Sequence, residues 1–440
     1  MARKTKEVEE GNASASTTKT EVKEGSVLAL AKAFNKKYSS NVFTAGNVIP
    51  EVRRSSIGGL SADYSLNGGI PLGIIVDFAG PSGSCKTLAA LNAVANYQKE
   101  FPDRTCVYVD AESTLPGQVE FFADLVGVQL DEAHFLRFKC FGFPAEKIFE
   151  TVLELQSADN IGLIVVDSVR ALISEADMTT EFSKDNGQRA TIAKPLAKFC
   201  RFMIGPLEEK QNSLIFINHS IVEPIPGTRA FKYTEPCGHA LNYYSGLKVR
   251  FLERQFTSGT DIELSVSKVQ AEKGVKPDGM VARFVVTKSR FGGLDRSGGR
   301  IIYRFNRGFG NGVDKAADLA EIITKYGIAK LDGKTWYVYD PMTGETYVDE
   351  NDEALKFVGK PPMMRYFADH PEFVGEYSKA VSEYINKSAR NINLLSEADL
   401  QKITKISKVL DRDESEESSN ENIDKDIYAR VEFDEGEEEA

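Results

Sequence analysis

The chain has 440 residues, of which 42% are hydrophobic, and a formal net charge of −11. This length allows one large domain with appendages, or two to three domains. All apolar runs fall short of the roughly 18 residues that span a bilayer, and the N-terminus is polar. We therefore expect neither an integral membrane protein nor a signal peptide. The five cysteines are scattered and form no CxxC pair, which excludes a disulfide scaffold and a thiolate zinc site and suits a reducing cytosol.

The acidic residues are concentrated at the C-terminal end of the sequence. Between Asp411 and Ala440 there are fourteen acidic and three basic residues, which account for the whole net charge. Residues 1–410 are therefore neutral, and the overall charge does not argue against a nucleic-acid partner. We expect residues 411–440 to form a disordered acidic tail.

One short helix is predicted near the N-terminus. Residues 1–24 are mainly Thr, Ser, Lys and Glu, which predicts disorder. Ser26 can cap a helix that runs to about Tyr38, and residues 25–50 would hold this helix and a linker. Its apolar stripe consists of Val27, Leu30, Ala31, Phe34 and Tyr38. A helix of this length is marginal alone, so it needs its own core or a neighbouring subunit to pack on.

Strand-like apolar runs alternate with helical patterns from residue 51 to about residue 312, which predicts an α/β core with a mostly parallel sheet and helices on both faces. The strand-like runs are Ile74–Ala79, Thr105–Val109, Phe135–Phe138, Ile161–Val166 and Leu214–Ile217. The helical stretches are Lys86–Gln98, Pro116–Leu125, Ala145–Leu155 and Gln188–Leu207. Four later runs with short turns between them predict antiparallel hairpins at one sheet edge: Leu247–Leu252, Ile262–Val266, Val281–Val286 and Ile301–Phe305.

Residues 313–410 are predicted to form a small α+β C-terminal domain. Asp314–Tyr326 has the periodicity of an amphipathic helix, with Gly327 as its C-cap. Thr335–Tyr339 is strand-like, and Glu372–Ile385 and Glu397–Leu410 are helical.

The first strand of the core leads into a phosphate-binding loop. The loop reads Gly80-Pro81-Ser82-Gly83-Ser84-Cys85-Lys86-Thr87 and opens a helix. In such a loop backbone N–H groups wrap phosphates at a helix N-terminus, so the whole run is predicted to bind ATP. Lys86 would reach the β/γ oxygens and Thr87 would hold Mg²⁺. The Cβ of Cys85 stands where the motif has glycine and would weaken the cradle. A glycine-rich turn that only caps the helix is the alternative.

Three further strand ends carry polar residues suited to ATP hydrolysis. Asp167 ends a buried run and can hold a Mg²⁺-bound water, and Glu112 is the candidate base that orients the attacking water. Asn218 and His219 follow another strand and can sense the γ-phosphate. Each of these residues also has an ordinary structural interpretation. Asp167 could cap a helix or form a turn, Glu112 could be a solvated loop carboxylate, and His219 could be a capping histidine. Convergence of these strand tips favours a nucleotide site, because open α/β sheets bind ligands at carboxyl ends.

Taken together, these residues resemble the RecA-type homologous recombinases over roughly Ile49 to Tyr339. Within that family the chain is most similar to the UvsX recombinases of T-even-like bacteriophages, in which a bulky residue also precedes the loop lysine and a histidine follows the sensor asparagine. The most specific runs are Gly68-Gly69-Ile70-Pro71-Leu72-Gly73, Tyr108-Val109-Asp110-Ala111-Glu112, Ile164-Val165-Val166-Asp167-Ser168-Val169-Arg170-Ala171-Leu172 and Gly238-His239-Ala240-Leu241.

The resemblance implies an ATP-dependent recombinase that forms helical filaments on single-stranded DNA. It would pair that strand with homologous double-stranded DNA and exchange strands, in recombination, repair and recombination-dependent replication. A phage recombination mediator and a single-strand-binding protein would be partners, in the cytoplasm of the infected host. Two loops, at about 174–188 and 221–238, would line the DNA. The DNA-binding candidates are Lys184, Arg189, Lys194, Arg229, Phe231, Lys232, Tyr233 and Gly238.

The resemblance also implies contacts between subunits. Lys288 and Arg290 match the two cations that reach a neighbour's γ-phosphate, and they would act like an arginine finger. The helix at 27–38 would dock on the next subunit, and Phe121 or Phe122 would stack on the adenine.

Two other functions compete with the recombinase. A ring-forming replicative helicase shares the ATPase fold, but it needs a further folded N-terminal domain, for which residues 1–24 are too polar. A filament protein that coats DNA without useful turnover is the other alternative, and Cys85 in the loop favours it.

The acidic tail generates a prediction about binding of duplex DNA. A flexible anion tethered beside a DNA-binding groove competes for its cations, so truncation after Leu410 is expected to raise affinity for duplex DNA. The gain should shrink as salt rises, because exposed charges are screened over about 8 Å at physiological ionic strength. Duplex binding by full-length and truncated protein across a salt series measures this effect. Equal affinities at low salt would contradict this prediction and leave the tail as a solubility device or a docking site for a partner.

Overall fold

The computed structural model describes residues 26–38, 52–112, 117–179, 192–224, 231–235, 238–258, 261–265, 278–291, 298–305, 312–349 and 352–390. Contacts divide the chain into two units, Met1–Val52 and Arg53–Ala440. The predictions for residues 1–24, for the helix Glu397–Leu410 and for the acidic tail lie outside the described residues.

Helix α1 (Val27–Tyr38) of the first unit forms where the apolar stripe predicts it. The Ser26 hydroxyl accepts a hydrogen bond from the Ala29 backbone N–H at 3.2 Å, as an N-cap residue does. Val27, Leu30 and Phe34 are exposed. Three of the five residues of the predicted stripe are therefore exposed, and Ala31 is half-buried.

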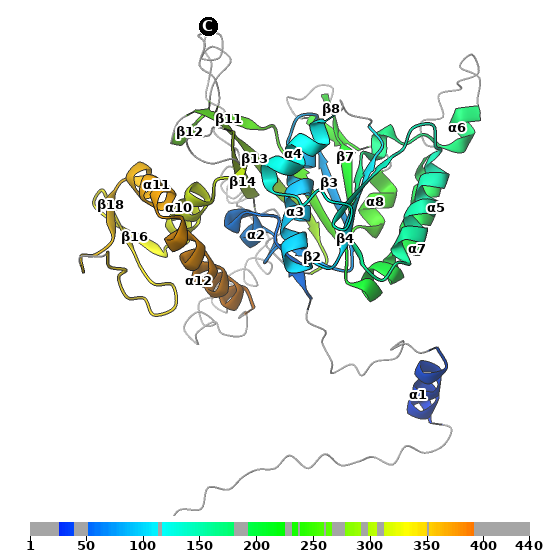
Figure 1. Cartoon of the computed structure of the whole chain (residues 1–440), viewed down its shortest axis with the longest axis horizontal. Helices are drawn as coiled ribbons and strands as arrows, with labels where there is room; N and C mark the ends of the chain where they lie inside the picture. The colour runs from blue at the N-terminus through cyan, green and yellow to red at the C-terminus, as the bar shows by residue number, and fades with distance from the viewer. Residues whose placement is uncertain are drawn as a thin grey trace, which may run out of the picture. The chain divides into compact units, whose positions relative to one another are not determined.

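The second unit is built on one large sheet (Figure 1). Six neighbouring strands of this sheet pair in parallel. In sheet order these strands are β10 (Leu247–Phe251), β3 (Ile75–Gly80), β7 (Leu214–His219), β6 (Ile161–Asp167), β4 (Thr105–Asp110) and β5 (Phe135–Lys139). Antiparallel strands extend the sheet beyond β10: β13 (Gly279–Ser289), β11 (Gln255–Ser258), β12 (Asp261–Ser265), β14 (Gly298–Arg304) and β15 (Gly312–Val313). The predicted α/β class is confirmed.

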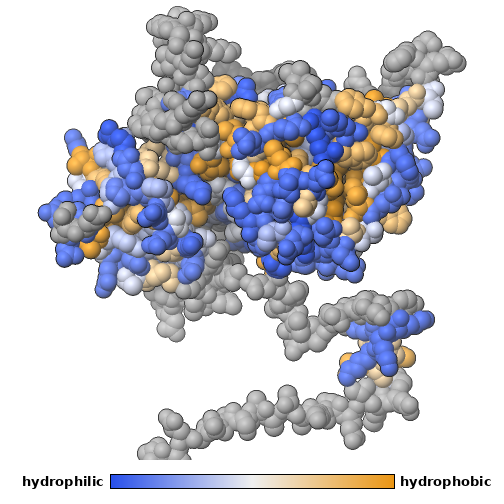
Figure 2. Space-filling model, in the orientation of Figure 1, coloured by the Kyte–Doolittle hydropathy of each residue, from blue (hydrophilic) through white to orange (hydrophobic). Residues whose placement is uncertain are grey.

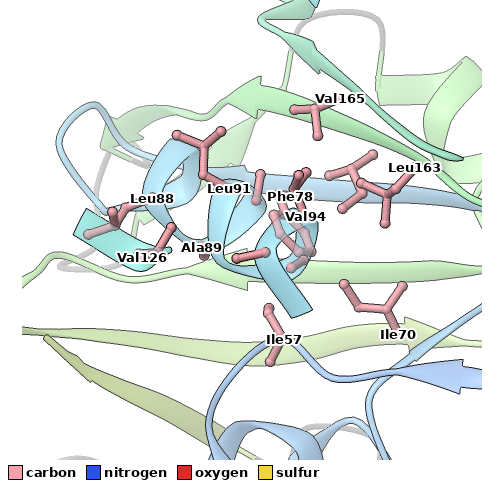
Figure 3. Packing of buried hydrophobic residues seen from close by; sticks show 14 of the residues in the cluster. Ile57, Ile70, Phe78, Leu88, Ala89, Leu91, Val94, Val126, Leu163 and Val165 are labelled. Atoms are coloured by element: carbon pink, nitrogen blue, oxygen red, sulfur yellow. The ribbon is translucent and has the colours of Figure 1, made fainter. Parts of the chain in front are cut away.

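Helices cover both faces of the parallel strands. On one face, Val76 and Phe78 of β3 pack with α2 (Leu60–Ser65), α3 (Lys86–Glu100) and α4 (Gln118–Val126). Figure 3 shows Leu88, Leu91 and Val94 of α3 among these side chains, with Leu163 and Val165 of β6. On the other face, Ile75 packs with α5 (Ala145–Gln156), α7 (Ala193–Lys210) and α8 (Gly238–Tyr244). Burial on both faces explains why these strands read as continuous apolar runs.

The first of the four later runs was assigned the wrong orientation. Leu247–Leu252 was predicted as part of the antiparallel edge, but β10 pairs in parallel with β3 and antiparallel only with β13. A parallel neighbour needs a crossover connection, and α8, which periodicity did not predict, lies immediately before β10.

Short elements surround the sheet and were not predicted. They are the antiparallel strand pair β1 (Arg54–Ser55) and β2 (Ile70–Pro71), the 3₁₀ turn η1 (Val169–Ala171), α6 (Glu175–Thr179) and the antiparallel strand pair β8 (Ile221–Pro224) and β9 (Phe231–Thr234). The β8–β9 pair falls within the second predicted DNA loop.

A second assembly of helices and strands follows the large sheet. It contains α10 (Lys315–Lys325), β16 (Ala329–Asp332), β17 (Thr335–Val338), β18 (Lys356–Val358), α11 (Lys360–Asp369) and α12 (Pro371–Arg390), around a separate apolar cluster. The Asp314 side chain accepts a hydrogen bond from the Ala317 backbone N–H at 2.9 Å. Gly327 has φ +71°, the left-handed conformation that ends a helix. The helix end predicted at Gly327 is therefore confirmed, whereas the cap by Asp314 was not predicted.

No helix among the described residues combines the length and the apolar composition that a membrane crossing requires.

Candidate nucleotide site

The phosphate loop lies where β3 ends and α3 begins. Gly80 is the last residue of β3 and Lys86 the first of α3. Gly83 has φ +75°, a conformation open to glycine at no steric cost. The turn therefore brings the loop's backbone to the N-terminus of a fifteen-residue helix, where N–H groups without helical partners bind anions.

Cys85 occupies the left-handed region, with φ +70° and ψ 19°. That conformation costs a residue with a Cβ roughly 1–2 kcal/mol, which explains why the motif has glycine there. The thiol Sγ lies 3.4 Å from the Met280 sulfur, and the side chain packs against the core. Burial raises the pKa of this thiol to about 11. The side chain of Cys85 therefore points toward the core and not into the phosphate loop. For this reason Cys85 supports the alternative of a DNA-coating protein without ATP turnover less strongly than the sequence suggested.

Lys86 is buried, and the loop itself holds its ammonium group. The Nζ donates to the carbonyls of Gly80 at 3.0 Å and Pro81 at 2.7 Å, and to the Ser84 hydroxyl at 3.3 Å. Burial lowers the pKa of Lys86 to about 8, while the charges of Asp167 and Glu112 oppose that shift. A cation that is desolvated to this degree gains most from an anionic ligand.

Asp167 connects the start of α3 to two strands. Its Oδ2 accepts hydrogen bonds from the Thr87 and Tyr108 hydroxyls, each at 2.7 Å. Its Oδ1 is buried without a hydrogen-bond partner among the described residues. Burial also raises the pKa of Asp167. An oxygen of this kind, beside a threonine hydroxyl, fits a water on Mg²⁺, which proteins commonly bind through one or two carboxylates and substrate phosphates.

Glu112 is held by two donors on the same oxygen. Its Oε1 accepts from the Ser168 hydroxyl at 2.5 Å and lies 2.8 Å from the His219 Nε2. Among the described residues the other oxygen, Oε2, has no hydrogen-bond partner. The hydrogen bond from His219 lowers the pKa of Glu112, so the carboxylate stays ionised at neutral pH. A fixed, ionised carboxylate with one open oxygen has the form of a general base for water.

Strand register explains why these residues meet. The β3–β7 pairing places Gly80 beside His219 and Ala79 beside the buried Asn218. The β4–β6 pairing places Asp110 beside Asp167. Because parallel strands end on the same edge, residues far apart in the sequence converge on the loop.

Two hydroxyl groups of this cluster were not assigned by the sequence analysis. Tyr108, fully buried on β4, and Ser168, directly after β6, orient the two carboxylates. Both lie in motifs quoted for the family resemblance, but only the pairing of β4 with β6 reveals their partners.

Lys288 and Arg290 lie away from the cluster within this chain. Lys288 Nζ donates to the Asn242 carbonyl and, at 3.4 Å, to the Tyr243 carbonyl. Arg290 Nη2 donates to the same Tyr243 carbonyl at 2.5 Å. Both cations therefore lie on the last turn of α8, where a helix end is electronegative, and both are solvent-accessible.

The structure places only some of the predicted DNA-binding and adenine-stacking residues. Lys194 is exposed near the start of α7, and Gly238 begins α8. Phe231, Lys232 and Tyr233 lie on β9. Phe121 of α4 is 62% exposed, whereas Phe122 packs against the core, so Phe121 is the better placed of the two for stacking. Lys184, Arg189 and Arg229 lie outside the described residues.

Comparisons with known proteins agree with this geometry. A family model described as the RecA N-terminal domain matches residues 25–278. The chain is 28% identical to Protein RecA of Enterococcus faecalis over 331 residues, which cover 74% of this chain and 81% of that protein. It is 27% identical to Protein RecA of Aquifex aeolicus over 360 residues, 80% and 91% of the two chains. Protein RecA of Trichormus variabilis is 26% identical over 339 residues, 77% and 82%.

The lowered pKa of Lys86 predicts a pH dependence of nucleotide binding. A bound polyphosphate favours the ammonium form, so binding takes up a proton once the pH exceeds about 8. Affinity for ATP is therefore expected to be nearly constant below that pH and to fall as the pH rises through it. Calorimetry in buffers of different ionisation enthalpy measures the uptake. The Lys86→Arg variant keeps its charge and should lose this uptake. The same uptake in both proteins would contradict the assignment.

Proposed function

Because the chain belongs to the RecA family, we propose that it is a recombinase that coats single-stranded DNA as a helical filament and exchanges strands with a homologous duplex. Family membership establishes its enzyme class, a DNA-dependent ATPase that uses ATP and Mg²⁺ and mediates strand exchange in recombination and repair. One observation carries the proposal for this site. Lys86, the Thr87–Asp167 pair and the Glu112–His219 pair converge at one edge of the parallel sheet.

We assign the residues of the site the following roles. ATP bound with Mg²⁺ supplies the polarised γ-phosphoryl group that water attacks. Lys86 and the loop N–H groups hold its phosphates, while Thr87 and Asp167 hold the metal, the latter through water. Tyr108 keeps Asp167 oriented through its 2.7 Å hydrogen bond. Glu112 takes a proton from the attacking water at Oε2, while Ser168 and His219 fix Oε1. Asn218 and His219 respond to the γ-phosphate.

The organisation of the chain supports assembly into a filament. We propose a docking helix within residues 25–50, an ATPase and DNA-binding core at 51–312 and a small domain at 313–410. The exposed apolar residues Val27, Leu30 and Phe34 suit packing on a neighbouring subunit. Figure 2 shows hydrophobic residues gathered near the middle of the core face in view. Lys288, which is half-buried, and Arg290, which is exposed, contact the end of α8 and would reach a neighbour's γ-phosphate.

Binding of DNA is assigned to the two loops and the residues around them. The candidates Lys184, Lys194, Arg229, Lys232 and Arg189 would pair with phosphates, and Phe231 and Tyr233 would stack on bases. Within the second of these loops, the described segments Ile221–Pro224 and Phe231–Thr234 pair as antiparallel strands.

Within the family we propose a phage recombinase of the UvsX type. Cys85 before the loop lysine and His219 after Asn218 support this assignment. It implies a role in recombination-dependent replication, a phage mediator and a single-strand-binding protein as partners, and the host cytoplasm as the location.

A joint-molecule assay tests the proposed function against its alternatives. The recombinase forms joint molecules with a homologous duplex and none with a heterologous one. A helicase unwinds both without regard to homology, and a coating protein does neither. Absence of homology-dependent products under conditions that support ATP hydrolysis would reject the recombinase.

Replacement of the candidate base is expected to separate binding from hydrolysis. Glu112→Gln should keep binding of ATP and DNA but lower ATP turnover by at least about 100-fold, because it removes the proton acceptor. Its filaments should then dissociate more slowly. Glu150→Gln, an exposed carboxylate on α5, is the matched control. Turnover at the parent rate in the Glu112→Gln variant would exclude Glu112 as the base.

Action of Arg290 across the subunit interface is tested by mixing two inactive variants. Arg290→Ala should lower DNA-stimulated hydrolysis by about 10³-fold, the low end of arginine-finger effects, while free monomers still bind nucleotide. Lys86→Ala should abolish turnover. A mixed filament contains interfaces with an intact loop on one side and an intact Arg290 on the other, so partial recovery is expected. No recovery in filaments shown to be mixed would argue against action in trans.

A further inference from the structure

One buried lysine on the core's central sheet contacts oxygens of three other side chains at once. Lys248 of β10 is 5% exposed, and its Nζ lies 3.3 Å from Asp77 Oδ2. The same Nζ donates to the carboxylate of Glu235 and to the side-chain oxygen of Asn242. The contact with Asp77 is an ion pair, and both oxygens of that buried carboxylate have no hydrogen-bond partner among the described residues.

The three contacted residues come from three different parts of the fold. Asp77 is fully buried on β3, directly beside Lys248 in the parallel register and three residues before Gly80. Glu235 is the residue that follows β9, at the end of the second predicted DNA loop. Asn242 lies in the last turn of α8. One side chain thus joins the strand of the phosphate loop to the DNA loop and to a helix.

The end of α8 extends the same connection to the candidate interface cations. The carbonyls of Asn242 and Tyr243 accept hydrogen bonds from Lys288 and Arg290. The side chain of Asn242 points inward to Lys248, while its carbonyl binds a cation that is solvent-accessible. A displacement of this helix turn would therefore change both groups of contacts.

Stability alone does not explain why charges are buried here. The cluster contains two carboxylates, Asp77 and Glu235, and one cation, Lys248, that contacts both. Arg250 is a second cation, because its Nη2 lies 3.8 Å from Glu235 Oε1. Burial nevertheless raises the pKa of Asp77 to about 7, which shows that Lys248 only partly offsets the desolvation. Apolar replacements of buried ion pairs are often as stable as the pairs or more so. The arrangement therefore indicates that these charged residues hold the surrounding strands and loop in position, and that stabilisation of the fold is not their main role.

We propose that Lys248 is a positioning residue that couples occupancy of the second DNA loop to the phosphate loop, through Glu235 on one side and Asp77 on the other. The inference rests on the proposed function, because it assigns regulation to that site. When DNA binds and moves the end of the loop, the contact between Glu235 and the Lys248 ammonium group changes. Lys248 then shifts relative to Asp77 on β3. By linkage, the nucleotide changes the affinity for DNA by the same factor.

The experiment compares affinities for a single-stranded oligonucleotide in the presence of ADP and of a slowly hydrolysed ATP analogue. The ratio of the two dissociation constants measures the coupling. Glu235→Gln keeps the Asp77–Lys248 pair and so preserves the buried charge balance on β3. The ratio is expected to fall at least about 5-fold, the lower bound of typical allosteric coupling. Glu253→Gln, an exposed carboxylate just beyond β10, makes the same charge change and should leave the ratio unaltered.

The ratio separates coupling from a merely structural role. If Glu235 only shapes the loop, both affinities change together and the ratio stays at the wild-type value, which overturns the proposal. Lys248→Arg keeps the charge and is expected to retain part of the coupling, whereas Lys248→Gln should lose it. Retention of full coupling in a folded Lys248→Gln protein, judged by its thermal melting, would also overturn the proposal. A wild-type ratio of one would instead count against the proposed function itself.

Discussion

The parallel pairing of β3 with β7, and of β6 with β4, is the constraint on which the site depends. It places Gly80 beside His219 and Asp110 beside Asp167. Every member of the candidate nucleotide site lies in one of these strands or in the segment that directly follows its end. A shift of one residue in any pairing would turn the side chains to the other face. Apolar packing on both faces of β3 prevents such a shift, so the core determines the geometry of the chemistry.

Buried charge is distributed in a way that distinguishes functional positions from structural ones. Arg304 is nearly inaccessible, but its guanidinium is paired with both Asp278 and Asp314, and one of these caps α10. That arrangement joins elements of the fold. Lys86 and Asp167 differ. Within the part of the chain that the structure describes, Lys86 donates to neutral oxygens alone, and one buried oxygen of Asp167 has no hydrogen-bond partner. A charged ligand stabilises a buried ionisable group most when that group lacks an oppositely charged partner. Perturbed pKa values concentrate at active sites for the same reason.

Cys85 shows how a departure from a motif is accommodated. The loop needs a left-handed residue before the lysine, and the chain adopts that conformation with a Cβ present. The strain is tolerated because the thiol packs against Met280 and the core instead of the loop interior. The phosphate loop therefore depends on backbone conformation more than on the identity of the residue at this position.

The sequence by itself determined the α/β class, the central strands and helices, and the residues of the phosphate loop, because apolar periodicity and loop spacing are local properties. It also indicated that Asp167, Glu112 and His219 stand at strand ends. Only the tertiary structure decided which oxygen each hydroxyl binds, that β10 runs parallel to β3, and that Lys248 joins Asp77 to Glu235. These features depend on strand order and register, which arise from packing between segments far apart in the chain. A local sequence pattern does not encode strand order or register. Hydrogen-bond partners at the edge of the sheet are therefore known only once the strands are paired.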